Sequence, residues 1–324
     1  INVRGFNQRN VAVMINGVPQ NDMENGWVYW SNWDGVADAA NSIQLQRGLS
    51  AVNLATPSIG GTMNIITDPA SNERGGKFKQ EGGAGNFLKT TFNYNTGLML
   101  GDKLALSGTL VRKTGDGIID ATWTDAWAYY LGSSLQLNED HRFELYAIGA
   151  PQRHGQNLYK QNIATYSQDL ANDVDGYDVT AFAEGNKFET EAGRTFNQNW
   201  GPVSSDYTGK QYWYMYGVGG LFGGGNQPRY SANFLNEREN FFHKPLVNLN
   251  HFMTINEKTR LSSVLYWSGG SGGGTGTYGS SFRKPAVDGQ KWYRSSPWGW
   301  DWDAAIATNS DRVDTKFHPT ENRS

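Results

Sequence analysis

The sequence predicts a mainly β protein whose antiparallel strands cross a membrane, preceded by a small α/β module. Three observations support this prediction: an aromatic but hydrophilic composition, segments that alternate between apolar and polar residues, and connections that alternate between short and long. Of the 324 residues, 38% are hydrophobic and 13% aromatic, and the mean hydropathy is −0.60. A soluble core is mostly aliphatic, whereas a membrane barrel combines a polar lumen, a thin apolar band and aromatic girdles.

Alternation with a period of two residues predicts each strand. The faces predicted to be apolar carry Leu88, Thr90, Phe92, Tyr94, Thr96 and Leu98 in residues 87–98, Leu104, Leu106 and Leu110 in 103–112, Trp127, Tyr129, Leu131 and Leu135 in 127–137, Phe143, Leu145 and Ala147 in 141–149, and Leu261, Leu265 and Trp267 in 261–267. A weaker strand is predicted at roughly 76–84, and residues 244–254 alternate less clearly. Most of these segments have about the 9–11 residues that a tilted membrane strand needs.

The connections between the predicted strands give a second, independent indication. After a short connection at 84–87, short and longer connections alternate from 99–102 on. Short turns are expected at 99–102, 138–140 and 255–259, a medium segment at 113–125, and long segments at 151–242 and 269–324. Membrane barrels have tight periplasmic turns and long extracellular loops, so the short set is predicted to be periplasmic and the long set extracellular. No run of apolar residues approaches the 18 that a transmembrane helix needs.

The first seventy residues contain four motifs in a recognisable order. They are Ile1-Asn2-Val3-Arg4-Gly5-Phe6, Val13-Met14-Ile15-Asn16-Gly17-Val18-Pro19, Ile43-Gln44-Leu45-Gln46-Arg47-Gly48 and Ile59-Gly60-Gly61-Thr62-Met63-Asn64-Ile65-Ile66-Thr67. A strand is predicted in each motif: at 1–4, where it reads as already under way, and at 11–19, 43–48 and 62–67. Together the four motifs resemble the C-terminal half of the plug domain of TonB-dependent outer-membrane receptors. The match departs from the family pattern after Gly48, where Leu49 replaces the usual Pro and Asn53-Leu54-Ala55 stands near the usual Tyr-Gly.

The resemblance implies a fold and a domain organisation. The fold expected is a small α/β plug domain, present in part, inside an antiparallel transmembrane β-barrel of which about 7 of 22 strands are present. The plug is expected at residues 1–70 and the barrel at 71–324, with extracellular loops at 151–242 and 269–324. The chain starts without Met or a signal peptide, so we expect it to be a piece of a longer precursor.

The resemblance also implies a function: active uptake of a siderophore, vitamin, glycan or peptide across the outer membrane of a diderm bacterium. The implied partners are outer-membrane lipid and the TonB–ExbB–ExbD complex, which would pull a segment that precedes Ile1. The long aromatic loops resemble those of Bacteroidota receptors, some of which work with a surface lipoprotein lid. Two alternatives stay open: a structural or secretion-complex subunit of the same fold, and a surface β-rich carbohydrate-binding protein.

Other classes of function receive no support. The net charge of −3 provides no basic footprint for nucleic acid. No catalytic motif or phosphate-binding loop is recognisable, so neither an enzyme nor a cofactor is predicted. The five histidines are scattered along the chain, which predicts no transition-metal cluster.

The candidate ligand-binding segment follows the second motif, where the resemblance places an apical loop of the plug. Its candidate residues are Asn25, Trp27, Tyr29, Trp30, Trp33 and Asp34. Aromatic rings among amides and carboxylates suit stacking on a ligand with hydrogen bonds around it. The alternative is that the rings pack the plug against the barrel wall. Further aromatic clusters lie at 212–216 and at Trp292, Tyr293, Trp298, Trp300 and Trp302.

Two further sets of residues carry expectations. The resemblance implies that Arg4 and Arg47 anchor the plug to the barrel wall, paired with carboxylates or carbonyl groups. Asp173, Asp175 and Asp178 have the spacing that begins a calcium loop, but the Glu expected further on is one residue late, at Glu184. A calcium site and a solvated acidic loop are both open readings of this segment.

Overall fold

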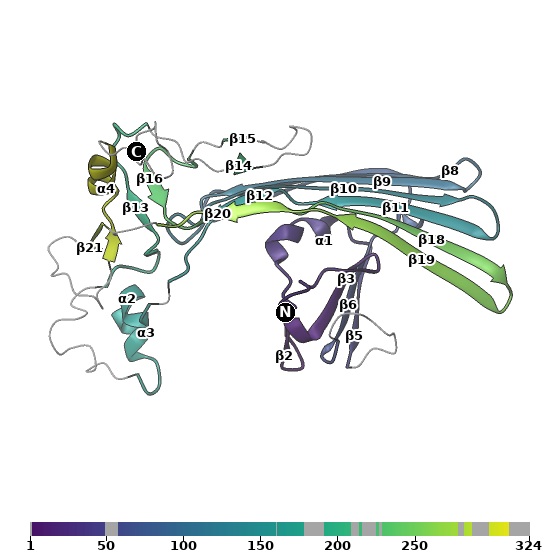
Figure 1. Ribbon diagram of the computed structural model, residues 1–324, viewed down its shortest axis with the longest axis horizontal. Helices are drawn as coiled ribbons and strands as arrows, with labels where there is room; N and C mark the ends of the chain where they lie inside the picture. The colour runs from purple at the N-terminus through teal and green to yellow at the C-terminus, as the bar shows by residue number, and fades with distance from the viewer. Residues whose placement is uncertain are drawn as a thin grey trace.

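The computed structural model describes residues 2–48, 58–159, 161–177, 191–208, 214–215, 225–226, 229–277, 282–286 and 298–310. These residues form a small four-stranded sheet and a large ten-stranded sheet, and the small sheet lies against one face of the large one (Figure 1). None of the helices in the described ranges is long and apolar enough to cross a membrane.

The N-terminal module (residues 2–71) is built on the small sheet, whose strand order is β4, β3, β6, β5. Its strands are β3 (Val11–Ile15), β4 (Val18–Pro19), β5 (Ser42–Arg47) and β6 (Gly61–Ile66). β3 and β6 are parallel, and the other two pairs are antiparallel. Parallel neighbours need a crossover connection, which here contains the 3-10 helix η2 (Trp30–Trp33) and the short helix α1 (Val36–Ala39). The strands predicted in the second, third and fourth motifs are therefore present.

Two tight hairpin turns shape this module. β1 (Asn2–Val3) and β2 (Phe6–Asn7) are joined by Arg4 and Gly5, with φ of 50° and 82°. β3 and β4 are joined by Asn16 and Gly17, with φ of 49° and 84°. Positive φ at both central residues characterises the type I′ turn, which matches the twist of a hairpin. The strand expected to continue through the first motif therefore ends at Val3, and Arg4 lies at a hairpin tip.

The large sheet contains the seven predicted membrane strands as an antiparallel series. They are β7 (Gly75–Gly83), β8 (Phe87–Met99), β9 (Leu104–Gly115), β10 (Thr124–Gln136), β11 (His141–Gly149), β18 (Leu246–Asn256) and β19 (Thr259–Ser268). Each strand pairs with the next in this order. The mainly antiparallel β fold with a small α/β module, predicted from the sequence, is confirmed. The described strands form an open sheet.

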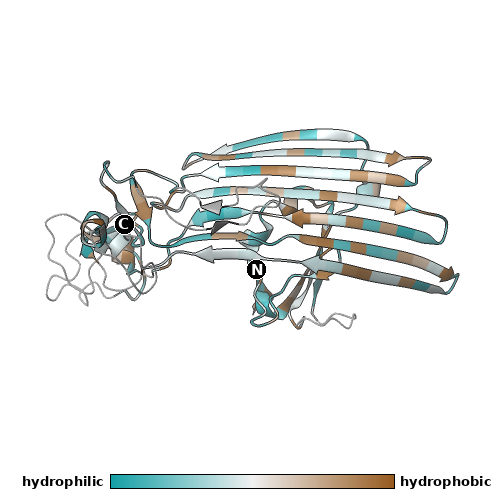
Figure 2. Cartoon of the chain, turned by 45° about the horizontal axis from the view of Figure 1, so that its top comes forward, coloured by the Kyte–Doolittle hydropathy of each residue, from teal (hydrophilic) through white to brown (hydrophobic). Residues whose placement is uncertain are grey.

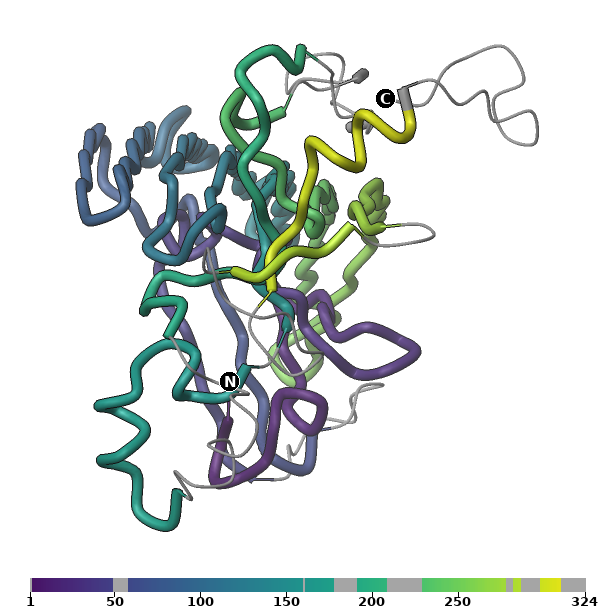
Figure 3. Tube along the Cα trace, turned by 90° about the vertical axis from the view of Figure 1, so that its left-hand side faces the viewer, coloured from purple at the N-terminus to yellow at the C-terminus, as the bar shows by residue number. Residues whose placement is uncertain are grey.

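The two ends of the large sheet differ. At one end, which we call the turn end, short turns join β8 to β9, β10 to β11 and β18 to β19. At the other, the loop end, the sheet is extended by β12 (Gln152–Gly155), β17 (Glu239–His243) and β20 (Ser271–Gly274). These three extension strands were not predicted. Viewed toward the loop end, the strand ends form an arc over the N-terminal module (Figure 3).

The large sheet has one apolar, exposed face and one face that covers the module. The hydropathy of successive residues alternates along the strands (Figure 2). The outward face exposes Leu88, Phe92, Tyr94, Leu98, Leu106, Leu110, Trp127, Leu131, Leu135, Leu145, Leu249, Leu261, Leu265 and Trp267. Inward positions include the buried Ala105, Ser107, Thr109, Tyr130, Glu144 and Tyr146. An apolar exposed face opposite a partly polar covered face is the pattern of a membrane barrel wall.

The main hydrophobic core lies between the module and the large sheet. The module contributes Val3, Val11, Val13, Ile15, Val18, Val28, Trp33, Val36 and Ile65, and the sheet contributes Tyr130, Tyr146, Ile148 and Leu246. The chain passes from β6 to β7 through the 3-10 helix η3 (Pro69–Ser71). The sheets thus change between Ile66 and Gly75. The domain boundary expected at residue 70 stays a prediction.

The remaining described segments gather at the loop end, where we call them the loop-end lobe (residues 156–159, 161–177, 191–208, 229–238, 282–286 and 298–310; Figure 1). Its elements are α2 (Ile163–Tyr166), α3 (Gln168–Asn172), β13 (Trp200–Pro202), β16 (Phe234–Asn236), β21 (Arg283–Pro285), β22 (Trp298–Trp300) and α4 (Trp302–Ser310). A separate short pair is formed by β14 (Tyr214–Met215) and β15 (Gly225–Asn226).

Candidate functional site

The segment from Asn21 to Asp34 begins in a turn held by the side chain of Asn21. The amide oxygen of Asn21, a residue that is 6% exposed, accepts the Val13 N–H at 2.8 Å. The amide nitrogen of Asn21 donates to the carbonyl oxygens of Val11 and Gly26 at 2.9 and 3.0 Å. These bonds satisfy backbone groups that the irregular chain would otherwise leave unpaired. The base of the candidate segment is therefore tied to β3.

The four aromatic residues of this segment divide into two pairs, and the first pair is turned inward. Trp33 is 4% exposed and belongs to the core between the module and the large sheet. The ammonium of Lys244 lies 5.7 Å from the centroid of the Trp33 ring. Trp30 packs against the same core and donates its indole N–H to Gln8 Oε1 at 2.8 Å. Trp30 and Trp33 therefore pack the module against the large sheet, as the alternative to ligand binding predicted.

In the second pair, Tyr29 is exposed and Trp27 is partly exposed. Tyr29 is 49% exposed, and its hydroxyl oxygen accepts a hydrogen bond from the Asn25 amide at 3.3 Å. The Asn25 amide oxygen accepts the Trp27 N–H at 2.8 Å, and the Arg9 guanidinium lies 4.8 Å from the centroid of the Trp27 ring. We call Arg9, Asn25, Trp27 and Tyr29 the apical patch. Arg9 was not predicted, because its 18-residue separation from Trp27 has no periodic signal.

Ion pairs fix the next turn of the chain to the large sheet near the loop end. Asp34, predicted as a ligand residue, forms a salt bridge with Lys113 of β9. An Asp38 carboxylate oxygen lies 2.8 Å from Lys89 Nζ of β8. Between them, Gly35 has φ of 86°, and a Cβ there would lie 2.6 Å from Ala128 Cβ. Glycine therefore permits both the left-handed turn and the close approach to β10.

The predicted anchoring residues Arg4 and Arg47 are both exposed in the described chain. Arg4 lies at the β1–β2 hairpin tip, and Arg47 ends β5, the edge strand of the small sheet. Among the salt bridges of the described residues, none involves either arginine. The module is instead held to β8 and β9 of the large sheet by ion pairs of Asp38 and Asp34. Neither aspartate was predicted to anchor the module to the barrel wall.

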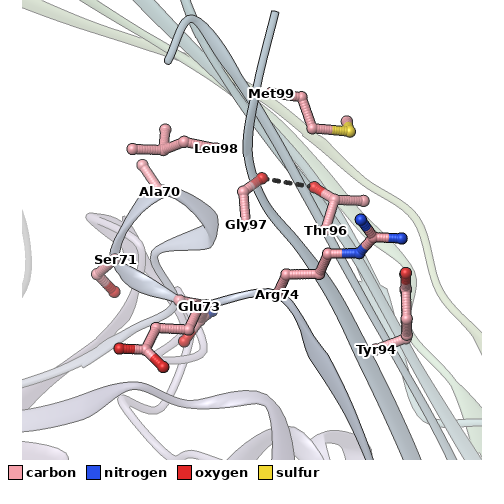
Figure 4. A pocket seen from close by; sticks show the side chains of 10 residues that line it. Ala70, Ser71, Glu73, Arg74, Tyr94, Thr96, Gly97, Leu98 and Met99 are labelled. Atoms are coloured by element: carbon pink, nitrogen blue, oxygen red, sulfur yellow. Dashed lines mark hydrogen bonds between the residues drawn. The ribbon is translucent and has the colours of Figure 1, made fainter. Parts of the chain in front are cut away.

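A second set of contacts lies where the module continues into the large sheet. Asn16 and Thr67 form two reciprocal hydrogen bonds of 2.8 and 2.9 Å, and Asn250 of β18 donates to the Asn16 carbonyl oxygen at 3.3 Å. Beside η3 is an open cavity of about 560 Å³, between this connection and β8 (Figure 4). Its lining includes Glu73, Arg74 and Tyr94. None of the residues that line this cavity belongs to the apical patch.

The remaining predicted sites are partly described. Asp173 follows α3 as its C-cap and is exposed, as is Asp175, whereas Asp178 lies outside the described residues. Within the described ranges, no three or more His, Asp or Glu side chains gather as a metal site. Tyr212, Trp213, Tyr216, Trp292 and Tyr293 also lie outside the described residues.

The described tryptophans of the third aromatic cluster form part of the packing of the loop-end lobe. Trp298 and Trp300 are 6% and 2% exposed. Trp300 stacks on Trp302 with ring centroids 5.0 Å apart, and the Arg283 guanidinium lies 3.9 Å from the Trp298 centroid. Such contacts stabilise a lobe that has little regular structure. The apical patch is thus the accessible aromatic surface among the predicted clusters that the structure describes.

Comparisons with known proteins agree with this architecture. Residues 1–62 match the family model of the TonB-dependent Receptor Plug Domain. The ferric citrate transporter FecA in its unliganded form is similar in fold, with a TM-score of 0.52 and 14% identity over 87% of this chain and 34% of that one. The ferric-catecholate import receptor Fiu from E. coli K12, in its open form, has a TM-score of 0.51 and 14% identity over 83% of this chain and 33% of that one.

The chain spans about a third of the length of these solved structures. No curated protein matches it in sequence. The fold defines the class: a plug-type module packed against the inner face of a partial barrel wall. Residues 1–62 match the plug-domain model of TonB-dependent receptors, and the described chain has the fold of part of their plug and the first strands of their barrel.

Proposed function

We propose that this chain belongs to an outer-membrane receptor that takes up a scarce or bulky nutrient by TonB-dependent active transport. The observation that carries the proposal is the position of the N-terminal module. It covers the inward face of an amphipathic sheet whose outward face is apolar and exposed. A soluble carbohydrate-binding protein would have no use for so extensive an exposed apolar face.

The orientation in the membrane follows from the lengths of the connections. Short turns are periplasmic and long loops extracellular in barrels of this type, so the turn end faces the periplasm and the loop end the cell exterior. The ion pairs of Asp34 and Asp38 reach Lys113 and Lys89, which lie two residues from the loop-end limits of β9 and β8. The segment that carries the apical patch is therefore on the side from which a ligand would arrive.

The apical patch is the proposed ligand contact within this chain. Trp27 and Tyr29 offer ring faces for stacking, while Asn25 and Arg9 offer hydrogen-bond donors beside them. Such a surface suits a ligand with both flat or ring-shaped faces and hydrogen-bonding groups, as siderophores, vitamins, glycans and peptides all have. Trp33 is not included, because it is buried in the core.

The proposed partners are outer-membrane lipid and the TonB–ExbB–ExbD complex. A surface lipoprotein that covers the loop-end lobe and an origin in the Bacteroidota are proposed only on the resemblance of the long aromatic loops. The predicted anchoring role of Arg4 and Arg47 stays a proposal. Both side chains are exposed, so they can contact barrel strands that this chain does not contain. Calcium at Asp173, Asp175 and Asp178 stays a proposal on the spacing of the three carboxylates; the two that the structure describes, Asp173 and Asp175, are exposed to solvent.

An uptake measurement with the full-length receptor tests the proposal. Cells that carry the receptor should accumulate its ligand, and deletion or a protonophore should abolish the accumulation. Normal uptake without the receptor would contradict a transport function and favour a structural or secretion-complex subunit. For the apical patch, Trp27→Ala should weaken ligand binding to the purified receptor by about fivefold, since one stacking contact is worth about 1 kcal/mol. Met23→Ala, at a neighbouring residue that is 96% exposed, is the matched control.

A further inference from the structure

The outward face of the large sheet brings together two histidines that are 110 residues apart in the chain. His141 is the first residue of β11, and His251 lies in β18, the neighbouring strand. In the register of these strands His251 is opposite Phe143, and His141 is opposite Met253. The two imidazoles are therefore diagonal neighbours on one face, a separation that long or aromatic side chains can bridge.

The geometry of the pair is unusual for two aromatic rings. His141 Nδ1 and His251 Nε2 are 2.9 Å apart, the ring centroids are 5.2 Å apart and the ring planes differ by 3°. A nitrogen separation so much shorter than the centroid separation means that the rings meet edge to edge. One nitrogen must donate and the other accept, so at least one ring is neutral. Phe143 stacks on His251 with centroids 4.4 Å apart, which holds the plane of that ring.

The separation of the nitrogens also matches a pair of metal ligands. Late first-row ions bind imidazole nitrogen at about 2.05 Å, so two nitrogens at right angles around one ion are about 2.9 Å apart. Tetrahedral coordination would place them about 3.3 Å apart at the same bond length. The observed 2.9 Å is set by the hydrogen bond between the rings, so it shows that both nitrogens can reach one ion but does not select a coordination geometry. Among late first-row divalent ions, Cu²⁺ binds imidazole nitrogen most tightly.

We propose that His141 and His251 form a two-histidine site for a late first-row divalent metal ion. Among these ions, Cu²⁺ is expected to bind most tightly. Binding requires the hydrogen-bonding ring to move its proton to its other nitrogen and both rings to turn so that their lone pairs converge. Water completes the coordination shell. The exposed Glu139 and Asp140 of the preceding turn add negative charge near this end of β11.

The site differs from the uptake function in position and consequence. It lies on the outward face at the turn end, on the opposite side of the wall from the module. β11 and β18 are consecutive in the wall but are joined through nearly a hundred residues, from Gly149 to Leu246. A bound ion would therefore link two strands that no short turn connects.

A copper titration of the metal-stripped, full-length receptor in detergent at pH 7.5 tests the site. Electron paramagnetic resonance of the unaltered receptor should show a Cu²⁺ centre with two equatorial imidazoles. His141→Gln and His251→Gln should each weaken this binding at least tenfold and leave at most one imidazole in the spectrum. His243→Gln, which alters a histidine bonded to Tyr129 on another part of the wall, should leave it unchanged.

The proposal is overturned if the unaltered receptor shows one imidazole or none, since the pair is then only hydrogen-bonded. It is also overturned if the two-imidazole signal survives both substitutions. Heat-modifiable migration in gels shows whether each variant is folded, and the spectrum of the unaltered receptor decides the question if a variant is not. None of these measurements depends on ligand uptake.

Discussion

The N-terminal module and the loop-end lobe both adjoin the large sheet, but they are held together by different groups. The module buries valines, isoleucines and Trp33 against the sheet, with ion pairs beside them. The lobe buries amides: Asn197 and Asn199 are 0% exposed and Asn236 is 1% exposed. Strands satisfy their own backbone, whereas irregular chain needs side chains to do so. In the lobe, the amide side chains supply the hydrogen bonds to backbone groups that strand pairing supplies in the module.

The largest effect is expected from Trp33→Ala in the module. Removing a buried indole costs about 3–5 kcal/mol through lost burial and the cavity that remains. Amide hydrogen exchange of β3 in the full-length receptor should accelerate by two to three orders of magnitude, because the module opens more often. Tyr29→Ala, four residues earlier and half exposed, is the control. Equal exchange in both variants would show that the apolar interface does not hold the module in place.

A somewhat smaller, local effect is expected from Asn236→Ala in the lobe. The Asn236 amide donates to the carbonyl oxygens of Ala121 and Gln156 at 2.9 and 3.1 Å and accepts the Arg238 N–H at 2.8 Å. Leaving buried backbone groups unpaired costs about 3 kcal/mol in total. Proteolysis within residues 156–238 should become about a hundredfold faster while exchange in β3 is unchanged. Asn233→Ala, at an exposed position, should have no effect.

The lobe should also respond to pH through Glu239, which lies in an extension strand beyond the membrane-spanning strands. Burial raises the pKa of Glu239 to about 8, against the opposing influence of Arg153. A raised pKa means that the folded state holds a proton which the unfolded state releases above about pH 4.5. Stability is therefore lost as pH rises from about 4.5 to 8 and is level above that.

Glu239→Gln should remove this dependence. The thermal midpoint of the lobe should fall between pH 6 and pH 9 in the unaltered receptor and stay nearly constant in the variant. The difference at pH 9 is on the order of a few kcal/mol in favour of the variant. Glu257→Gln, in an exposed turn, is the matched control. A midpoint that rises with pH in the unaltered receptor would contradict a neutral buried carboxyl group.

The smallest effect on stability is expected at the apical patch. Trp27→Ala loses a partly exposed contact with Arg9, worth about 0.5–1 kcal/mol. Exchange in β3 should change less than tenfold, while ligand binding weakens as proposed above. A loss of stability as large as that of Trp33→Ala would place Trp27 among the packing residues and remove it from the ligand-binding surface.

The sequence predicted the membrane strands well, because alternation with a period of two depends only on neighbouring residues. Leu106, Leu131 and Leu135 face outward as expected. The extension strands β12, β17 and β20 were missed because their residues do not alternate in this way. Arg4 was assigned to a strand although the following Gly5 allows a tight turn, and the positive φ of both residues forms that turn.

The candidate site was predicted less completely. The sequence located the aromatic segment, but it could not separate Trp27 and Tyr29 from Trp30 and Trp33. That division depends on which rings meet the large sheet, a contact between residues more than a hundred positions apart. The same limit explains why Asp34 was predicted to contact the ligand. It also explains why Lys89 and Lys113 were not predicted as the ion-pair partners of Asp38 and Asp34. It also explains the histidines, which are scattered in sequence but adjacent in space.

The pairing of β11 with β18 has a consequence for how such receptors diversify. The wall resumes its register at Ile148 and Leu246 as if the intervening residues were absent. Because the entropic cost of closing a loop grows only slowly with its length, a segment inserted here can lengthen, shorten or be exchanged with little penalty to the wall. The strand boundary is therefore a natural splice point, at which evolution or a protein engineer can graft a new loop-end lobe onto an unchanged wall.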